Sequence, residues 1–454
     1  MLHSKVFDSE RPMTLPTRLI PLLTLLACVS LASLAQAQSL VELFDAAKGY
    51  DASYQSAKSQ ADATLAHGEQ ARAGILPTVG LGAAVSQTSQ DSSLSALSGK
   101  NYGLQSATLT ASQPLYRPGN WASFAQGKKS TELAQYQLLA AEQDLIVRVS
   151  QAFFDVLAAT DSLTYVRSLK AAVAEQLASA KRNFEVGTST IVDTRDAQAR
   201  YDLTVAQELA ADNDLRVKSL ALDQLVGQSG AEPKPMRAPV LLDAVQPDDV
   251  SLWVQQSEAL NPLVKQTEIA LDVAKLETEK AQAGHKPTLD LGASYYASNN
   301  NGSSTASGNY NLNQASLGLS FNLPLFAGYS IQNRVKETLA LEDKARSDLD
   351  GAKRSVAQGT RSAFFGLQSG LSQVKAYEAA EASSQSALDA NKLGYQVGVK
   401  INIDVLNAQS QLYSTKASLA KARYDVLVGG LKLRQATGVL KDEDLLAINA
   451  LLVP

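Results

Sequence analysis

The chain contains an internal repeat: a segment of its first half recurs, without a gap, about 211 residues further on. Residues 184–193 read FEVGTSTIVD, and residues 395–404 read YQVGVKINID. A repeat of this length indicates two copies of one structural unit, and such chains tend to build rings and walls of equivalent elements. The landmarks that stay in register are Val186/Val397, Gly187/Gly398, Asp193/Asp404, Ala197/Ala408, Gln198/Gln409 and Gly227/Gly438.

The N-terminus predicts export from the cytoplasm. Arg18 precedes an apolar stretch, 19–34, and the small-x-small motif AQA follows at 35–37. This layout is typical of a secretory signal peptide, here 1–37, with a possible start at Met13.

A lipoprotein signal that ends at Cys28 is the alternative, although Leu26 fits such a signal poorly. After cleavage behind Ala37 no cysteine remains in the chain. The sequence then offers neither disulfides nor thiolate chemistry.

Composition excludes several classes of function. The formal net charge is −4 at pH 7, so there is no basic excess and we expect no nucleic-acid partner. No apolar run behind the signal reaches the roughly 18 residues of a transmembrane helix. His67 and His285 have no cysteine or acidic cluster at ligand spacing, so no metal site is predicted. Without a nucleophile constellation or a phosphate loop, we predict neither an enzyme nor a cofactor.

Two long stretches predict long helices. No glycine or proline lies between Gly127 and Gly187, and apolar residues recur there in two rows at heptad spacing. About 60 residues at roughly 1.5 Å each make a rod near 100 Å. The matching stretch of the second half, 330–395, has weaker rows. The rows of the first rod are Leu138, Leu145, Ala152, Ala159, Val166, Val173 and Ala180, then Val149, Val156, Leu163, Leu177 and Phe184, with Lys170 as a polar exception.

Each rod breaks at a Val-Gly pair and resumes as a shorter helix. The breaks lie at Gly187 and Gly398, and the shorter helices end at Gly227 and Gly438. Glycine supplies the backbone angles that a tight reversal requires. Each half is therefore predicted to contain a helical hairpin with a sharp tip.

Ahead of each rod, pairs of segments about ten residues long alternate polar with apolar or small residues, and period two predicts strands. Loops rich in Ser, Asn and Gly join each pair, at 87–101 and 297–314. Such strands suit a transmembrane β-barrel, which four strands cannot close alone, so several chains must share one barrel. The four segments are 77–86, 102–114, 287–296 and 315–324.

In this order and in both halves, these motifs resemble the TolC family of outer-membrane efflux and secretion channels, over residues 40–447. The stretches that carry the resemblance are GHKPTLDL at 284–291, GLSFNLPL at 318–325, YQVG at 395–398, IDVLNAQ at 403–409 and ARY at 422–424.

The resemblance implies an α+β membrane protein that is a homotrimer. Long coiled-coil hairpins would form a twelve-helix α-barrel, and four strands per chain would share a twelve-stranded transmembrane β-barrel, with a small equatorial mixed domain between. The predicted divisions are the signal peptide 1–37, the first repeat 38–230 (helix, two strands, long helix, tip, helix), the equatorial linker 228–250, the second repeat 251–438 and the C-terminal equatorial segment 439–454.

The function implied is an exit duct of tripartite drug efflux pumps or type I secretion systems, in the outer membrane of a Gram-negative bacterium and extending into the periplasm. The partners implied are outer-membrane lipid, a periplasmic adaptor (membrane fusion) protein and an inner-membrane RND or ABC transporter. The alternative is a secreted or surface coiled-coil spacer with no pore, which would not need strand pairs at matching places. The adaptor would dock on the tips, at Val186, Gly187, Thr188, Val397, Gly398 and Val399.

Asp404 is the candidate gate residue. It lies six residues past Gly398 at the start of a helix, and Asn407 shares its helix face. In a threefold tube, the Asp404 side chains would form a carboxylate ring that favours cations. The alternative is that this aspartate only complements the helix dipole. The resemblance favours the ring, since Asp404 falls on the constriction aspartate of the family. Asn407 falls where many relatives carry a second acidic ring, so we expect a single, weaker one.

The resemblance also implies a lock between the hairpins in the closed state. Tyr395 matches a tyrosine that bonds the aspartate equivalent to Asp193. Lys400 stands where relatives have an arginine that contacts this aspartate and the residue before it, here Val192. Lysine lacks the bidentate fork of arginine, so the lock should be looser. Packing alone is the alternative role of Tyr395. Opening would be an iris-like movement driven by partners that bind the open form better.

Overall fold

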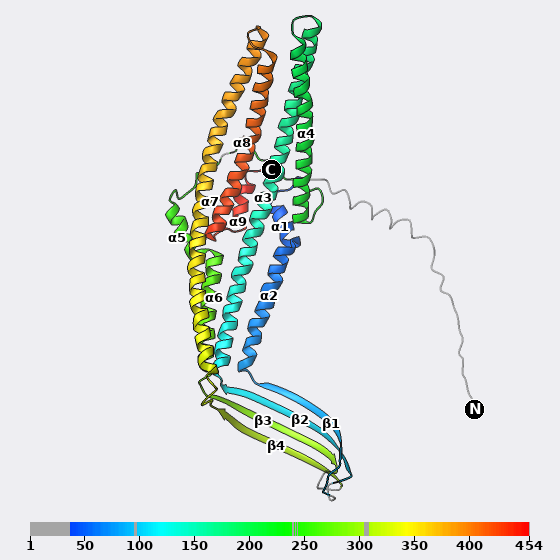
Figure 1. Ribbon diagram of the computed structural model, residues 1–454, viewed down its shortest axis with the longest axis vertical. Coiled ribbons are helices and arrows are strands. Elements are labelled where there is room, and N and C mark those ends of the chain that lie inside the picture. Colours follow the sequence, from blue (N-terminus) through cyan, green and yellow to red (C-terminus); the bar gives the residue numbers. More distant parts are fainter. Residues whose placement is uncertain are drawn as a thin grey trace, which may run out of the picture.

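The computed structural model describes residues 37–94, 98–237, 240, 242, 244–303 and 308–453. Cys28 and all but the last residue of the predicted signal peptide lie outside this range. The described chain is a long rod with a curved sheet at one end and two helical tips at the other (Figure 1). Both halves run from the sheet end to a tip and back towards the middle.

Helices account for most of the rod. The longest, α3 and α7, have 68 and 67 residues. The elements in chain order are α1 (Leu40–Tyr50), α2 (Ala52–Arg72), the short 3-10 helix η1 (Ala73–Ile75), β1 (Thr78–Gln90), β2 (Lys100–Tyr116), α3 (Pro118–Glu185), α4 (Ile191–Val226), α5 (Val250–Leu260), α6 (Pro262–Ala283), β3 (Thr288–Asn301), β4 (Asn309–Asn322), α7 (Ser330–Gln396), α8 (Asn402–Thr437) and α9 (Glu443–Asn449).

The hairpins pack along the predicted heptad rows. Helix α3 lies between α4 and α8 on the tip side, while α2 and α6 flank its sheet-side half. Lys170, the polar exception in the row, forms an ion pair with Glu208 on α4. The ammonium group of Lys170 is thus paired with a carboxylate on the other helix of the same hairpin. The row positions of α3 that are buried include Leu145, Val149, Val156, Ala159, Leu163, Val173, Leu177 and Ala180.

The main core lies midway along the rod, where α1, α3, α8 and α9 meet. The rings of Phe153 and Phe154 touch edge to face, and Phe154 stacks on Tyr424 of α8 at a centroid distance of 5.5 Å. Single β-bridges join Gln38 to Pro233 and Met236 to Leu452. Gln38 and Leu452, near the two ends of the described chain, and the segment between the halves are therefore held together beside this core.

Both tips end their long helix in the same way. Gly187 and Gly398 have φ of 79° and 78°, the left-handed region in which a side chain is strained. The amide of Thr188 bonds the carbonyl of Asn183 at 2.8 Å, and that of Gly187 bonds Phe184 at 3.0 Å. The same two bonds recur at the second tip. This pair of bonds is a Schellman motif, which closes the helix end and reverses the chain.

The sheet has the antiparallel order β1-β2-β3-β4, so β1 and β4 are its edges. The register sorts its side chains by face, because neighbours along a strand point to opposite sides. One face carries exposed large apolar side chains and the other mainly small hydroxylated ones. The apolar face holds Val79, Leu81, Val85, Leu109, Tyr295, Leu317, Leu319 and Phe321, and the opposite face holds Thr78, Ser106, Thr108, Thr110, Ser112, Ser294, Ser316 and Ser320.

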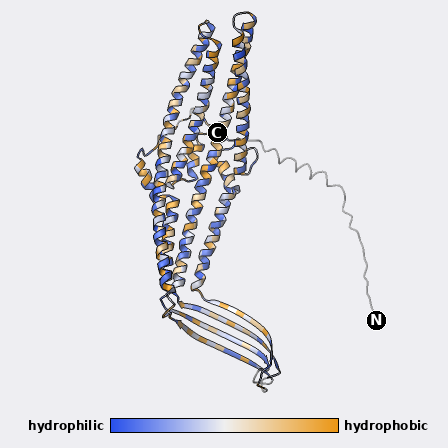
Figure 2. Ribbon diagram, viewed as in Figure 1, coloured by the Kyte–Doolittle hydropathy of each residue, from blue (hydrophilic) through white to orange (hydrophobic). Residues whose placement is uncertain are grey.

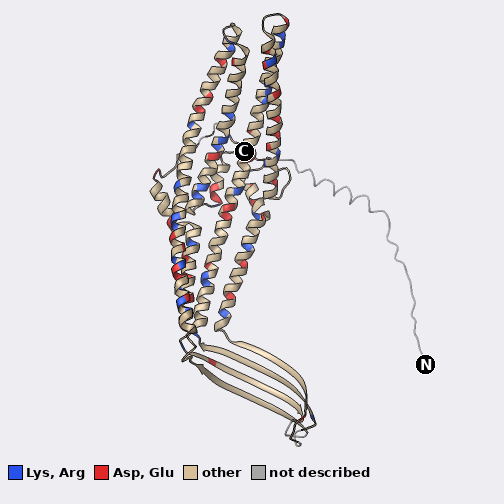
Figure 3. Ribbon diagram, viewed as in Figure 1, with Lys and Arg blue, Asp and Glu red and all other residues tan. Residues whose placement is uncertain are grey.

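Hydropathy and charge follow this division. Hydrophobic residues alternate along the strands (Figure 2), and charged residues are concentrated on the helices (Figure 3). Within the four strands only Lys100 and Asp290 are charged, and they lie near opposite ends of the sheet. Arg117 pairs with Asp290 through two bonds of 2.7 and 2.6 Å, at the junction of β2 with α3.

The strands are longer than the sequence predicted. They have 13, 17, 14 and 14 residues, not about ten, and continue into the segments 87–101 and 297–314 that were expected to be loops. Most of the added residues are polar, on both faces of the sheet, so the alternation that marks a strand fades while backbone pairing continues. No helix in the described part of the chain is both long and apolar enough to cross a membrane.

Candidate functional site

The two tip aspartates, equivalent in the repeat, have different surroundings. Asp193 closes a capping box on α4: its Oδ2 accepts from the amide and the hydroxyl of Thr190, at 3.0 and 2.8 Å. The Asp193 amide donates in return to Thr190 Oγ1 at 3.3 Å. Asp193 therefore stabilises the start of its own helix.

Asp404 makes no such cap. The N-cap of α8 is Ile401, which has no side-chain acceptor, and the Asp404 amide bonds the Ile401 carbonyl. The Asp404 carboxylate lies 3.5 Å from Lys400 Nζ, and both side chains are substantially exposed. An exposed pair of this kind contributes about 0–1 kcal/mol. The carboxylate of Asp404 thus remains accessible to solvent.

Asn407 contacts the first hairpin. Its Oδ1 accepts a 2.5 Å hydrogen bond from Arg200 Nη2 on α4. Arg200 was not among the residues predicted from the sequence. One signal could have indicated it: Arg200 lies seven residues after Asp193, and so on the same helix face.

Two further hydrogen bonds join the hairpins near the tips. The Asn183 amide of α3 donates to the Tyr395 hydroxyl at 3.1 Å, and Gln176 of α3 donates to Asn402 Oδ1. Together with the bond between Arg200 and Asn407, these contacts form what we name the inter-hairpin seam.

An apolar side chain fills the centre of the seam. Leu406 of α8 is 1% exposed and inserts between α3 and α4. Burial of a leucine contributes about 1.5–3 kcal/mol, more than a hydrogen bond between neutral groups such as that of Asn183 with Tyr395. Its neighbours in this cluster are Leu169, Val173, Leu177, Ala180 and Ala197.

The seam is not fully satisfied. The side-chain nitrogen of Asn402 and the oxygen Oε1 of Gln409 are buried with no hydrogen-bond partner among the described residues. Each such group costs about 1–3 kcal/mol. The net stabilisation that the inter-hairpin seam provides is therefore smaller than the sum of its contacts.

A further polar contact joins α3 and α8 at the main core, farther from the tips than the inter-hairpin seam. The Tyr424 hydroxyl of α8 donates a 2.6 Å bond to Asp161 Oδ2 of α3. Burial raises the pKa of Asp161, and the bond from Tyr424 lowers it by less. Burial also raises the pKa of Tyr424, with a further contribution from the Asp161 carboxylate. The phenol is thus the proton donor in this pair.

The contacts of the lock residues within one chain differ from those that the resemblance implies. Tyr395 bonds Asn183, not Asp193, and Lys400 pairs with Asp404. Asp193 is engaged by Thr190, and the preceding Val192 is exposed. The contacts of Tyr395 and Lys400 with Asp193 that the resemblance implies stay a prediction.

The tip residues expected to dock an adaptor all lie at the far end of the rod. The valines at positions 186, 397 and 399 are exposed, the last at 78%. Thr188 is tied down by two bonds to the Asn183 carbonyl, one from its amide and one from its hydroxyl. A rigid turn that presents apolar side chains is suited to contact with another protein.

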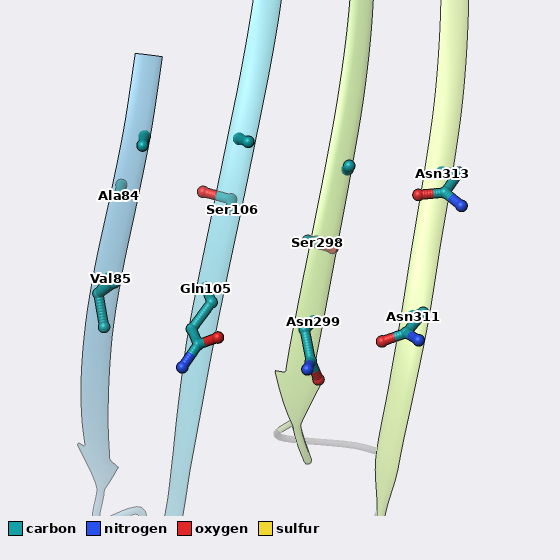
Figure 4. A pocket seen from close by; sticks show the side chains of 11 residues that line it. Ala84, Val85, Gln105, Ser106, Ser298, Asn299, Asn311 and Asn313 are labelled. Carbon is teal, nitrogen blue, oxygen red and sulfur yellow. The ribbon is translucent and has the colours of Figure 1, made fainter.

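A shallow hollow of about 550 Å³ lies at the other end of the molecule, on the sheet. Amide and hydroxyl side chains line it, among them Gln105, Asn299 and Asn311 (Figure 4). Within the described residues, no group of three or more His, Cys, Asp or Glu side chains could hold a metal ion.

Comparison with known proteins identifies the family. The model of a family described as "Outer membrane efflux protein" matches residues 43–228 and 253–439. The chain belongs to this family. The resemblance to TolC proteins is thereby confirmed, and so is the fold class predicted from the sequence. Like other members of this family, the protein lies in the outer membrane and extends into the periplasm.

Individual relatives agree over the whole length. The outer membrane protein TolC of Vibrio cholerae is 32% identical over 434 residues, which cover 95% of this chain and 98% of TolC. The proteases secretion protein PrtF of Dickeya chrysanthemi is 29% identical, covering 94% of both chains. A solved structure of CusC superposes with a TM-score of 0.77 over 88% of this chain and 92% of CusC, at 18% identity. At that identity the match shows the fold alone.

Proposed function

We propose that three copies of this chain close into one tube, which is the outer-membrane exit duct for an efflux pump or a type I secretion system. The observation that carries the proposal is the two-faced sheet joined directly to the long hairpins. Its apolar face suits lipid and its hydroxylated face suits a water-filled interior. Strands β1 and β4 are edges, and edges in lipid must be paired, which neighbouring copies can do.

A spacer without a pore has no use for such a sheet. An apolar face on a four-stranded sheet would be a liability on a soluble coiled coil, because exposed edges and apolar faces promote aggregation. The similarity to PrtF supports export of protein, and the name of the family supports efflux of small molecules. Both cargoes are compatible with one passive duct whose specificity resides in the pump.

The periplasmic mouth of the duct is the proposed gate. Asp404 from each copy would face the axis, with Asn407 one turn along. The inter-hairpin seam would hold the mouth closed from within each chain, through Tyr395 and Asn183. Lys400, Asp193 and Val192 would complete the lock between the hairpins. Opening would separate the hairpins, which the modest net strength of the seam permits.

The proposed partners are a periplasmic adaptor protein and, behind it, an inner-membrane transporter. The adaptor would bind the tips, where Val186, Val397 and Val399 are exposed on turns fixed by Gly187 and Gly398. Apolar contact on a rigid turn avoids the ordering cost that a flexible loop would add.

A deletion strain tests this function. Loss of the gene should increase retention of ethidium in the cells or stop release of an exported protein, and the wild-type gene should restore export. Val399→Asp should reach the outer membrane but fail to restore export, whereas Val399→Ala should restore it. Unchanged ethidium retention and unchanged protein release in the deletion strain would contradict the proposal.

A further inference from the structure

We propose that Arg200 sets the charge of the periplasmic mouth, and that it offsets Asp404 so strongly that the mouth has little preference for cations. The inference rests on the proposed function, since it requires these side chains to face the conduit. It differs from the expectation drawn from the sequence, which was a weaker but still acidic ring.

The geometry places Arg200 beside the gate aspartate. Asp404 and Asn407 are three residues apart on α8, so their side chains share one face about 5–6 Å apart. The guanidinium of Arg200 bonds Asn407 Oδ1 at 2.5 Å. It therefore lies on the same face as Asp404, about one helical turn away.

The charge of this arginine is not cancelled by its own partner. Asn407 is a neutral acceptor, and no carboxylate of the described residues lies within 4.0 Å of the Arg200 guanidinium. Arginine keeps its charge at every physiological pH. Asn407 thus positions a full positive charge at a place where an aspartate would have neutralised it.

A second cation acts on Asp404 directly. Lys400 Nζ lies 3.5 Å from its carboxylate. Between the tips and Arg200 on α4 and Asn407 on α8, each chain carries three carboxylates, Asp193, Asp196 and Asp404, and three cations, Arg195, Arg200 and Lys400. The charges of these two helix starts therefore balance in each copy. All lie on the last turns of the hairpins, where fields extend over a Debye length of about 10 Å at 0.1 M salt.

Reversal potentials in planar bilayers test the inference. Purified wild-type channels in a KCl gradient should show a K⁺/Cl⁻ permeability ratio close to one. Arg200→Gln keeps an N–H donor for Asn407 but removes the charge, so the ratio should rise severalfold. Arg200→Lys keeps the charge and should behave like the wild type. Arg216→Gln, on the same helix and paired with Asp212 at 2.7 Å, is the control away from the mouth.

One more variant separates charge from mechanical strength. Asn407→Asp adds a negative charge but strengthens the bond to Arg200, because a carboxylate pairs with guanidinium better than an amide does. If charge decides, Asn407→Asp and Arg200→Gln both raise the ratio. If Arg200 acts only by holding the two hairpins together, the two variants change the conductance in opposite directions and leave the permeability ratio unchanged.

The outcomes are distinct. Channels whose ratio is the same in the wild type and in Arg200→Gln would overturn the role of Arg200 and leave the proposed duct intact. A wild-type K⁺/Cl⁻ permeability ratio far above one would also overturn the role of Arg200 and leave the proposed duct intact. Folded wild-type protein that forms no channels would overturn both the duct and this inference.

Discussion

The Tyr395 hydroxyl accepts a 3.1 Å hydrogen bond from the side-chain amide of Asn183, and this bond ties the end of α7 to the end of α3. It lies one helical turn before each tip, at the end of the rod opposite the sheet. The two residues are 212 positions apart in the chain. Their contact joins one repeat to the other at the place where the proposed gate must open.

Tyr395→Phe should loosen this contact. The variant removes one hydrogen bond, worth about 0.5–1.5 kcal/mol, and keeps the ring. Single-channel recordings should then show higher conductance or more frequent opening than the wild type. Tyr413→Phe is a control of the same chemistry, because Tyr413 lies on α8 and packs against the neighbouring cluster around Leu406, whereas Tyr395 packs against Leu388, Val405 and Leu412. Equal effects of the two variants would assign Tyr395 to packing alone.

Asp193 and Asp404 should respond differently to replacement by alanine. Asp193→Ala breaks the capping box with Thr190, so thermal unfolding in detergent should report a loss of about 0.3–1 kcal/mol per chain. Asp404→Ala removes a carboxylate that caps nothing, so stability should change little. Its reversal potential should shift towards anions instead, since Lys400 and Arg200 remain. The reverse pattern would show that the gate aspartate has been misassigned.

The tip glycines should be needed for their backbone conformation and not for space. A Cβ at Gly187 or Gly398 would meet no atom within 4 Å, but both residues have positive φ. Alanine there should cost about 1–2 kcal/mol. Gly351→Ala, inside the helix α7, should instead stabilise by about 0.5–1 kcal/mol, because alanine favours a helix interior. Thermal unfolding of the three variants checks both signs.

The buried pair of Asp161 and Tyr424 predicts a pH dependence of stability. Burial raises the pKa of Asp161 above its ordinary value near 4, so the folded state binds its proton more tightly than the unfolded state. Burial of the ionised Asp161 carboxylate lowers the stability of the protein. This cost is absent below the pKa of the unfolded state and is reached as the pH rises through the pKa of the folded state. Asp161→Asn, which can still accept from Tyr424, should be more stable than the wild type at neutral pH and no different in acid.

Melting temperatures measured from pH 3 to 7 check this prediction. Asp155→Asn on the same helix is the control, because Asp155 lies at the surface and pairs with Lys218 at 3.1 Å. A wild type more stable than Asp161→Asn at pH 7 would show that the charged carboxylate is needed.

Much of the fold was predictable because its signals are local. A stretch of α3 free of glycine and proline, with apolar residues at heptad spacing, can only be a long helix with one buried face. Gly187 and Gly398 mark the reversals because few other residues adopt positive φ. The strand ends could not be placed, since the consecutive residues Asn299 and Asn300 continue the backbone pairing with polar side chains on both faces.

The seam could not be predicted from local pattern. Arg200 and Asn407 are 207 residues apart, and their contact depends on how one hairpin lies against the other. The repeat also suggested that Asp193 and Asp404 would behave alike. The difference arises one turn earlier, where Thr190 and Ile401 occupy the same place in the repeat and only threonine can cap a helix.

The most direct test of the central claim is a single-channel recording of the wild-type protein. Protein extracted from the outer membrane, shown to be helical by circular dichroism, is added to a planar bilayer. Discrete, long-lived conductance steps of one size are expected, small because the mouth is closed and larger in Tyr395→Phe. Folded, membrane-derived protein that gives no such steps at any voltage would contradict the account.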